Sequence, residues 1–256
     1  MARFIPYQAN YNTVNTLGRY ASGLLYSSTV ISIGISVLGR YQLYPDLKDI
    51  LIPVNILLIC VYAFFDQRAL YIFTQAEMKR RVDWLDNSFG TNFSGKKSTE
   101  YYTNENLNTG LKKLAVNCFE NSHHTHFIIS EMTPWAIGET IVIVGIFVVS
   151  AILGDREIVR LFFELSLPAF LVNKLIKILF YKAKIGHVYD RFKTLFNDLK
   201  SSDLSHNKTA EALRAIVEYE TTLAWASIPL DSKIFFEHKD ELAADWIELK
   251  REYQLD

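Results

Sequence analysis

YASGLLYSSTVISIGISVLG, residues 20–39, is the stretch that decides the fold, because none of its 20 residues carries a charge. Arg19 and Arg40 bracket it. A helix of this length spans about 30 Å, which is the thickness of the hydrocarbon core of a bilayer. The run is longer than the apolar part of a secretory signal, and no small-x-small cleavage site follows it before Arg40. We therefore expect an uncleaved membrane-spanning helix.

Three more apolar runs follow. ILIPVNILLICVYAFF, residues 50–65, is also free of charge, and two further runs cover residues 134–154 and 158–181. The last run carries charged residues near both ends, where long basic side chains can reach the membrane interface. Together these runs predict an all-α membrane protein, with four transmembrane helices in two hairpins and a cytosolic helical domain.

The chain divides into five segments on this basis. They are an N-terminal lead-in (1–19), a first transmembrane hairpin (20–65), a cytosolic stalk and middle segment (66–131), a second transmembrane hairpin (132–181) and cytosolic C-terminal helices (182–256). Lysines and arginines such as Arg81 and Lys182 stand in the long polar segments close to the span ends. The positive-inside rule then places both polar segments and both termini in the cytoplasm.

Periodicity refines the polar segments. Apolar residues recur at steps of three and four over residues 66–85, which predicts that the second span continues outward as a helical stalk. Residues 86–98 are rich in Asn, Ser and Gly and predict a loop. A helix should follow from about Asn106 to Glu131, and Pro134 should stand in the first turn of the third span. The tail predicts helices near 181–199, 208–227 and 231–253.

Composition narrows the function only a little. Half of the residues are hydrophobic and the net charge is −1, so any site for an anion must be a local patch. The two cysteines, Cys60 and Cys118, have no metal-type spacing. The sequence contains no phosphate-binding loop, no GxSxG and no HExxH motif, so nothing in it indicates an enzyme or a cofactor.

Basic and aromatic residues gather in the middle segment. Cations pair with phosphates, and aromatic rings stack on bases, so this mixture is typical of a nucleotide site. The candidate ligand-binding residues are Arg80, Arg81, Trp84, Tyr101, Tyr102, Lys112 and Lys113. The alternative is that the cations lie on solvated helix faces, and that Trp84 and the tyrosines pack in the core of a small cytosolic domain.

Two groups of ionisable residues each allow two interpretations. His123, His124 and His126 follow Glu120 and could hold a metal, but no second Cys/His pair supports them, so a polar helix face near the membrane interface is the alternative. Glu139 and Glu164 lie within predicted spans, and mark either a proton or ion pathway or the interface.

The first span itself contains a ladder of small residues. Ser28, Ser32 and Ser36 stand four residues apart. Small residues at this spacing let helices approach closely in lipid. The ladder therefore indicates a compact bundle or an oligomer.

The middle segment also carries a family resemblance. RRVDWLDNSFG (80–90), STEYYTNE (98–105) and KLAVNCFENS (113–122) lie between two apolar hairpins. This arrangement resembles the four-transmembrane effector family associated with bacterial SMODS-type nucleotidyltransferases of cyclic-oligonucleotide (CBASS-like) antiphage systems. Asp86, Phe89 and Gly90 stand where that family has an Asp followed by a Gly-containing turn, and Tyr101 and Tyr102 match its aromatic pair.

The resemblance implies a sensor and effector of the bacterial inner membrane. A partner nucleotidyltransferase would make a cyclic oligonucleotide, the cytosolic part would bind it, and the assembled chains would disrupt the bilayer and arrest or kill the infected cell. Such a switch needs a ligand that binds one conformation better than another. Two alternatives stay open. One is a small channel or transporter subunit, for which Pro53 and Asn55 in the second span are the best hint, and the other is a membrane-anchored helical scaffold.

Overall fold

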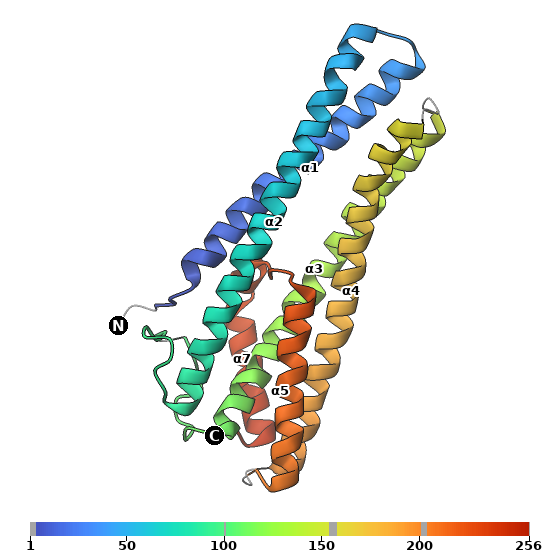
Figure 1. Cartoon of the computed structure of the whole chain (residues 1–256). Helices are drawn as coiled ribbons and strands as arrows, with labels where there is room; N and C mark the ends of the chain where they lie inside the picture. The colour runs from blue at the N-terminus through green and yellow to red at the C-terminus, as the bar shows by residue number, and fades with distance from the viewer. Residues whose placement is uncertain (1–3, 100, 154–157, 201–203, 256) are drawn as a thin grey trace. The chain divides into compact units, whose positions relative to one another are not determined.

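The computed structural model describes residues 4–99, 101–153, 158–200 and 204–255 (Figure 1). Within these ranges it describes the side chains of all residues except 40, 147, 150–153, 158–169 and 206. All regular elements of the described residues are helices, and Phe4 and Thr99 form a single antiparallel bridge. The prediction of an all-α fold is therefore confirmed for this part of the chain.

Four long helices precede three shorter ones. In chain order they are α1 (Gln8–Arg40), α2 (Pro45–Phe89), α3 (Leu111–Leu153), α4 (Ile158–Leu199), α5 (His206–Ala226), α6 (Ser232–Glu237) and α7 (Lys239–Tyr253). Helix α2 runs without a break through 45 residues. This confirms that the second apolar run continues into a helical stalk.

The chain forms two compact units. We call residues 1–10, 74–133 and 178–256 the polar unit, and residues 11–73 and 134–177 the apolar unit. Helices α2, α3 and α4 each contribute one part to each unit. A single helix therefore connects the apolar run of residues 50–65 with residues of the polar unit.

Within the described residues, three helices are long and apolar enough to cross a membrane, namely α1, α2 and α3. In the most apolar 18-residue window of α2 only 6 % of the residues are buried, so its apolar side chains need an apolar surrounding that the chain itself does not supply. The side chains of residues 158–169 lie outside the described part. The fourth span and the two-hairpin count therefore stay predictions.

The core of the polar unit is built around Phe119 of α3, whose side chain is fully buried. Five aromatic rings lie within 6.0 Å of its centroid, and they belong to α4 and α7: Tyr189, Phe192, Phe196, Trp246 and Tyr253. The α4 members Tyr189, Phe192 and Phe196 stand three and four residues apart, so they share one helix face.

Three predicted helix boundaries are wrong. Pro134 lies inside α3 and not in the first turn of a helix, and α4 passes through Tyr181 without interruption. A proline inside a helix removes one hydrogen bond to the preceding turn. Next to it, the Thr133 hydroxyl donates to the carbonyl of Ile129 at 2.6 Å, which ties that turn together. Helix α2 also continues to Phe89. The loop, predicted to begin at residue 86, therefore begins four residues further along the chain.

The apolar unit is held together by neutral polar groups. Asn55 of α2 is buried; its Oδ1 accepts from the Ser28 hydroxyl at 2.7 Å, and its Nδ2 donates to Ser32 Oγ at 2.9 Å. Ser28 and Ser36 are buried, as close helix packing along the small-residue ladder requires. The side-chain amide of Asn55, which the sequence suggested as a possible channel residue, thus forms hydrogen bonds between α1 and α2.

Candidate functional site

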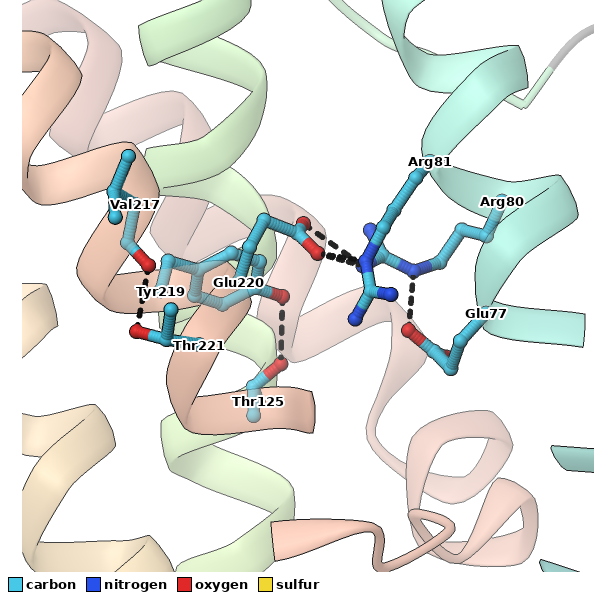
Figure 2. Close-up of polar contacts among 8 residues, drawn as sticks. All are labelled: Glu77, Arg80, Arg81, Thr125, Val217, Tyr219, Glu220 and Thr221. Atoms are coloured by element: carbon cyan, nitrogen blue, oxygen red, sulfur yellow. Dashed lines mark hydrogen bonds and ion pairs between the residues drawn. The ribbon is translucent and has the colours of Figure 1, made fainter. Parts of the chain in front are cut away.

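Two arginines and two glutamates form an ion-pair cluster in the polar unit. We call Glu77, Arg80, Arg81 and Glu220 the arginine clamp, because it joins α2 to α5 (Figure 2). Glu77 and Arg80 stand three residues apart and therefore lie on the same face of α2. Glu220 comes from α5, about 140 residues further along the chain.

The clamp has the geometry of a tight pair. Arg80 Nη2 donates to both Glu220 oxygens, at 2.8 and 2.9 Å, and Arg80 Nε donates to Glu77 at 2.9 Å. Arg81 Nε donates to Glu220 at 2.6 Å. The Arg80 side chain is only 10 % exposed, and that of Glu220 16 %. Removing one partner would leave a charge in a poorly hydrated place, which is strongly destabilising.

A neutral contact between α5 and α3 lies next to the clamp in sequence. The buried Tyr219 hydroxyl, next to Glu220 in sequence, lies 3.3 Å from the hydroxyl of Thr125 on α3 (Figure 2). Burial raises the pKa of Tyr219 well above its usual range, so the phenol stays neutral. Helix α5 is therefore attached to α2 through charges and to α3 through this neutral contact.

The seven predicted ligand residues all belong to the polar unit, but most make internal contacts. Trp84 is 4 % exposed. The Lys113 ammonium contacts Glu105 at 3.1 Å, and its side chain is 4 % exposed. Lys112 is half-buried in the first turn of α3. Of the two arginines, only Arg81 is substantially accessible, with 30 % of its side chain exposed.

The aromatic pair is also part of the packing. The rings of Tyr101 and Tyr102 lie 4.8 Å apart, and Tyr101 also contacts Tyr7 edge-on at 6.3 Å. The Tyr102 hydroxyl donates to Asp83 at 3.2 Å, and burial together with the charge of Asp83 raises the pKa of Tyr102. The structure thus brings the predicted residues into one unit without presenting them as one open surface.

Two aspartates near the end of α2 organise the following loop. Asp86 accepts four hydrogen bonds, from the Thr91 hydroxyl, the Phe93 and Ser94 amides and the Ser94 hydroxyl, all at 2.6 to 2.8 Å. Asp83 accepts from the amide and the hydroxyl of Ser98. The sequence signal for this arrangement is an aspartate pair three residues apart before a stretch rich in Ser and Thr, which our sequence reasoning did not use.

Gly90 ends α2 in the left-handed conformation, with φ of +70°. The Gly110 amide donates to the carbonyl of Ser88 at 2.8 Å, which closes the loop at its base. Glycine is the residue that adopts this conformation without strain. Gly90 therefore marks the point where α2 gives way to the loop.

The sequence left either a metal site or a polar helix face near the membrane interface for His123, His124 and His126, and in the structure all three rings pack against other helices. His123 is buried, and the His126 ring stacks on Tyr189 with centroids 5.6 Å apart. His124 contacts Phe235 of α6. The C-terminal helices cover this part of α3, which the local pattern could not reveal. Among the described residues, no three potential ligands converge on a metal position, and Glu120 accepts hydrogen bonds from Thr103 and Asn104 instead.

One of the two carboxylates predicted within spans can be placed. Glu139 accepts a hydrogen bond from the Tyr26 hydroxyl at 2.6 Å, in the apolar unit. Glu164 lies outside the residues whose side chains the structure describes.

Comparisons with known proteins add no name to this geometry. No protein-family model, no curated protein and no solved structure matches the chain.

Proposed function

We propose that this chain is a multi-pass effector of the bacterial inner membrane, with four transmembrane helices and cytoplasmic termini, in a nucleotide-signalling antiphage system. A cyclic oligonucleotide, made by a partner nucleotidyltransferase, binds the polar unit and changes the state of the spans. The observation that carries the proposal is the continuity of α2. One helix contains both the apolar run of residues 50–65 and three members of the arginine clamp.

The arginine clamp acts as the resting lock in this scheme. Glu220 joins α5 to two guanidiniums of α2, so a displacement of α5 pulls these contacts apart. The conformation with the intact clamp is favoured without ligand. A nucleotide that binds the other conformation more tightly shifts the population by its difference in affinity.

The spans act as the output. Three helices of the described residues have the length and apolarity to cross a bilayer, and few residues in the apolar window of α2 are buried in the single chain. Contact between several copies would cover part of this surface, which is why we include a homo-oligomer in the proposal. Rearranged spans then breach the bilayer and stop growth.

Dye release from vesicles tests the proposal. The purified chain is reconstituted into vesicles of bacterial phospholipids that contain a fluorescent dye, and cyclic di- and trinucleotides are added, with linear nucleotides as controls. We expect one cyclic species to release the dye and the linear ones to have no effect. Retention of the dye with every cyclic nucleotide, although the protein is inserted, would contradict the proposal. Ion flux without dye release would favour the channel alternative. The absence of both ion flux and dye release would favour the scaffold alternative.

A further inference from the structure

A groove of about 1100 Å³ is lined by residues of α4 and α5 in the polar unit. Its walls come from one stripe on each helix, from Phe180 to Asp198 on α4 and from Lys208 to Trp225 on α5. Sites for small ligands commonly have volumes of about 300 to 1000 Å³. The groove is therefore large enough for a ligand of more than one nucleotide unit.

The two ends of the groove differ in charge. At one end Lys208 contacts two carboxylates, Asp198 at 2.7 Å and Glu211 at 2.8 Å. The hydrogen bond to Asp198 raises the pKa of Lys208, so this ammonium is held by its acidic partners. An anionic ligand would be repelled from this end.

Further along the groove, basic side chains outnumber acidic ones. Glu218 is shared by two guanidiniums, Arg191 at 3.0 Å and Arg214 at 3.3 Å. Lys184 adds an exposed ammonium, and no carboxylate of the described residues lies within ion-pair distance of it. Asp190 also lines the groove, but its carboxylate contacts the ammonium of Lys193 at 3.6 Å. This part therefore offers positive charge to an anion.

Two exposed aromatic rings stand at the positive end. Phe180 is 57 % exposed and Trp225 52 % exposed, and their centroids lie 6.4 Å apart in an edge-on arrangement. Large aromatic side chains contribute little to the fold when half of their surface is not packed against the chain. Exposed aromatic faces and exposed cations along one groove are a combination that binds bases and phosphates.

We propose that this end of the groove, lined by Phe180, Lys184, Arg191 and Trp225, binds the nucleotide. A base stacks on Trp225, and the phosphates contact Lys184 and Arg191. The inference rests on the proposed function, and it moves the ligand from Arg80 and Arg81 to a different pair of helices. It frees the arginine clamp to act as a lock and not as the binding site.

The position of the groove links the ligand to the clamp. Glu218, Thr222 and Trp225 of α5 line the groove, and Glu220 of the same helix contacts α2. A ligand that separates α4 from α5, or turns α5 about its axis, displaces Glu220 together with the helix that carries it. Binding in the groove thereby weakens the contact between α5 and the helix that carries the apolar run.

The test measures nucleotide affinity of the full chain in detergent by calorimetry. The probes are cyclic di-AMP, cyclic GMP-AMP and cyclic tri-AMP, with AMP, inorganic phosphate and glycerol 3-phosphate for comparison. We expect saturable binding of one cyclic nucleotide. Trp225→Ala and Lys184→Glu should each weaken it by about tenfold or more, since stacking and phosphate contacts have this order of magnitude. Trp225→Phe should retain most of the affinity.

Matched controls separate the groove from the general surface. Phe236→Ala removes another exposed aromatic ring of the polar unit, and Lys233→Glu reverses another exposed charge. Both should leave the affinity unchanged. Each variant is also melted without ligand, and because Trp225 and Lys184 are exposed, we expect melting temperatures close to that of the wild type.

The outcomes distinguish this inference from the proposed function. If a cyclic nucleotide releases dye from vesicles but binds both groove variants as tightly as the wild type, the groove is not the site and the effector function stands. If a cyclic nucleotide binds in the groove but releases no dye, the site stands and the effector function fails. If glycerol 3-phosphate binds as tightly as the cyclic nucleotides, the groove holds a lipid headgroup and the inference is overturned.

Discussion

The polar and the apolar units bury polar side chains in opposite ways. In the polar unit the buried groups include charges, among them Arg80, Asp86 and Lys113, and each is held by partners of that unit. In the apolar unit every buried polar side chain that the structure describes is neutral: Ser28, Ser36, Asn55 and Thr140. A charge is costly where no water reaches its surroundings, while a hydroxyl or an amide needs only one or two bonds.

The two units also differ in the packing of their apolar side chains. Phe119 of the polar unit is enclosed by five aromatic rings, as in the core of a water-soluble domain. The buried cluster of the apolar unit consists of Leu25, Ile143 and Leu171, with Tyr62 against it. A unit surrounded by lipid gains little from burying more apolar surface, because lipid is as apolar as its own interior. The comparison indicates water around one unit and lipid around the other.

Phe119→Ala should give the largest loss of stability, because the change empties the centre of the aromatic core. We expect the free energy of unfolding of the polar unit to fall by about 4 kcal/mol. Denaturant melts followed by tryptophan fluorescence measure it, since Trp246 contacts Phe119. The exposed Phe236→Ala is the control and should cost less than about 0.5 kcal/mol. A small loss for Phe119→Ala would mean that the polar unit has no such core.

Glu220→Ala should have the next largest effect. It leaves the buried Arg80 with only Glu77 of the clamp, and we expect a loss of about 3 kcal/mol. Glu218→Ala is the matched control on the same helix, because Glu218 and its partners Arg191 and Arg214 are about one-third or more exposed. It should cost at most about 1 kcal/mol. Equal losses in the two variants would show that burial of the clamp makes no difference.

Asp86→Ala should loosen the loop after α2 and leave the rest of the polar unit folded. Four donors lose their acceptor, and we expect a loss of about 2 kcal/mol. Hydrogen exchange of the Phe93 and Ser94 amides measures the local effect, and these amides should exchange much faster than in the wild type. Glu248→Ala on the exposed face of α7 is the control. Unchanged exchange at Phe93 and Ser94 would contradict the role of Asp86.

Asn55→Leu should have the smallest effect. It removes two hydrogen bonds between α1 and α2, and bonds of this kind between membrane helices contribute about 0.5 to 1 kcal/mol each. Thermal melts in detergent should therefore show a loss of about 1 kcal/mol. Cys60→Ala, at an exposed position of the same helix, should have no measurable effect. If Asn55→Leu lowered the stability as much as Glu220→Ala, the contrast between the two units would be contradicted.

Local patterns predicted the helices well and their partners poorly. The spacing of Leu70, Phe73, Ala76 and Val82 in residues 66–85 is a local property, and the continuous helix α2 follows from it. Arg80 and Arg81 look like free cations in the sequence, since their partner Glu220 stands about 140 residues away. The histidines of α3 look like a polar helix face for the same reason, because the rings that contact them come from α4 and α6.

The candidate groove shows the same limit. Phe180 and Lys184 stand four residues apart and could be placed on one face of α4 from sequence, as could Thr221 and Trp225 on α5. Nothing in the single sequence tells that these two faces meet. Pro134 was misplaced because a proline is read as a helix start, although neighbouring groups such as the Thr133 hydroxyl let α3 continue through it.

Dye release by Glu220→Gln tests the central claim, that the arginine clamp holds the spans in their resting state. The variant keeps the shape of the side chain and removes its charge, and it is reconstituted into dye-filled vesicles beside the wild type and Glu218→Gln. We predict that Glu220→Gln releases dye without any nucleotide, while the other two proteins retain it. If Glu220→Gln melts cooperatively, inserts normally and still retains the dye, the clamp does not control the membrane segments.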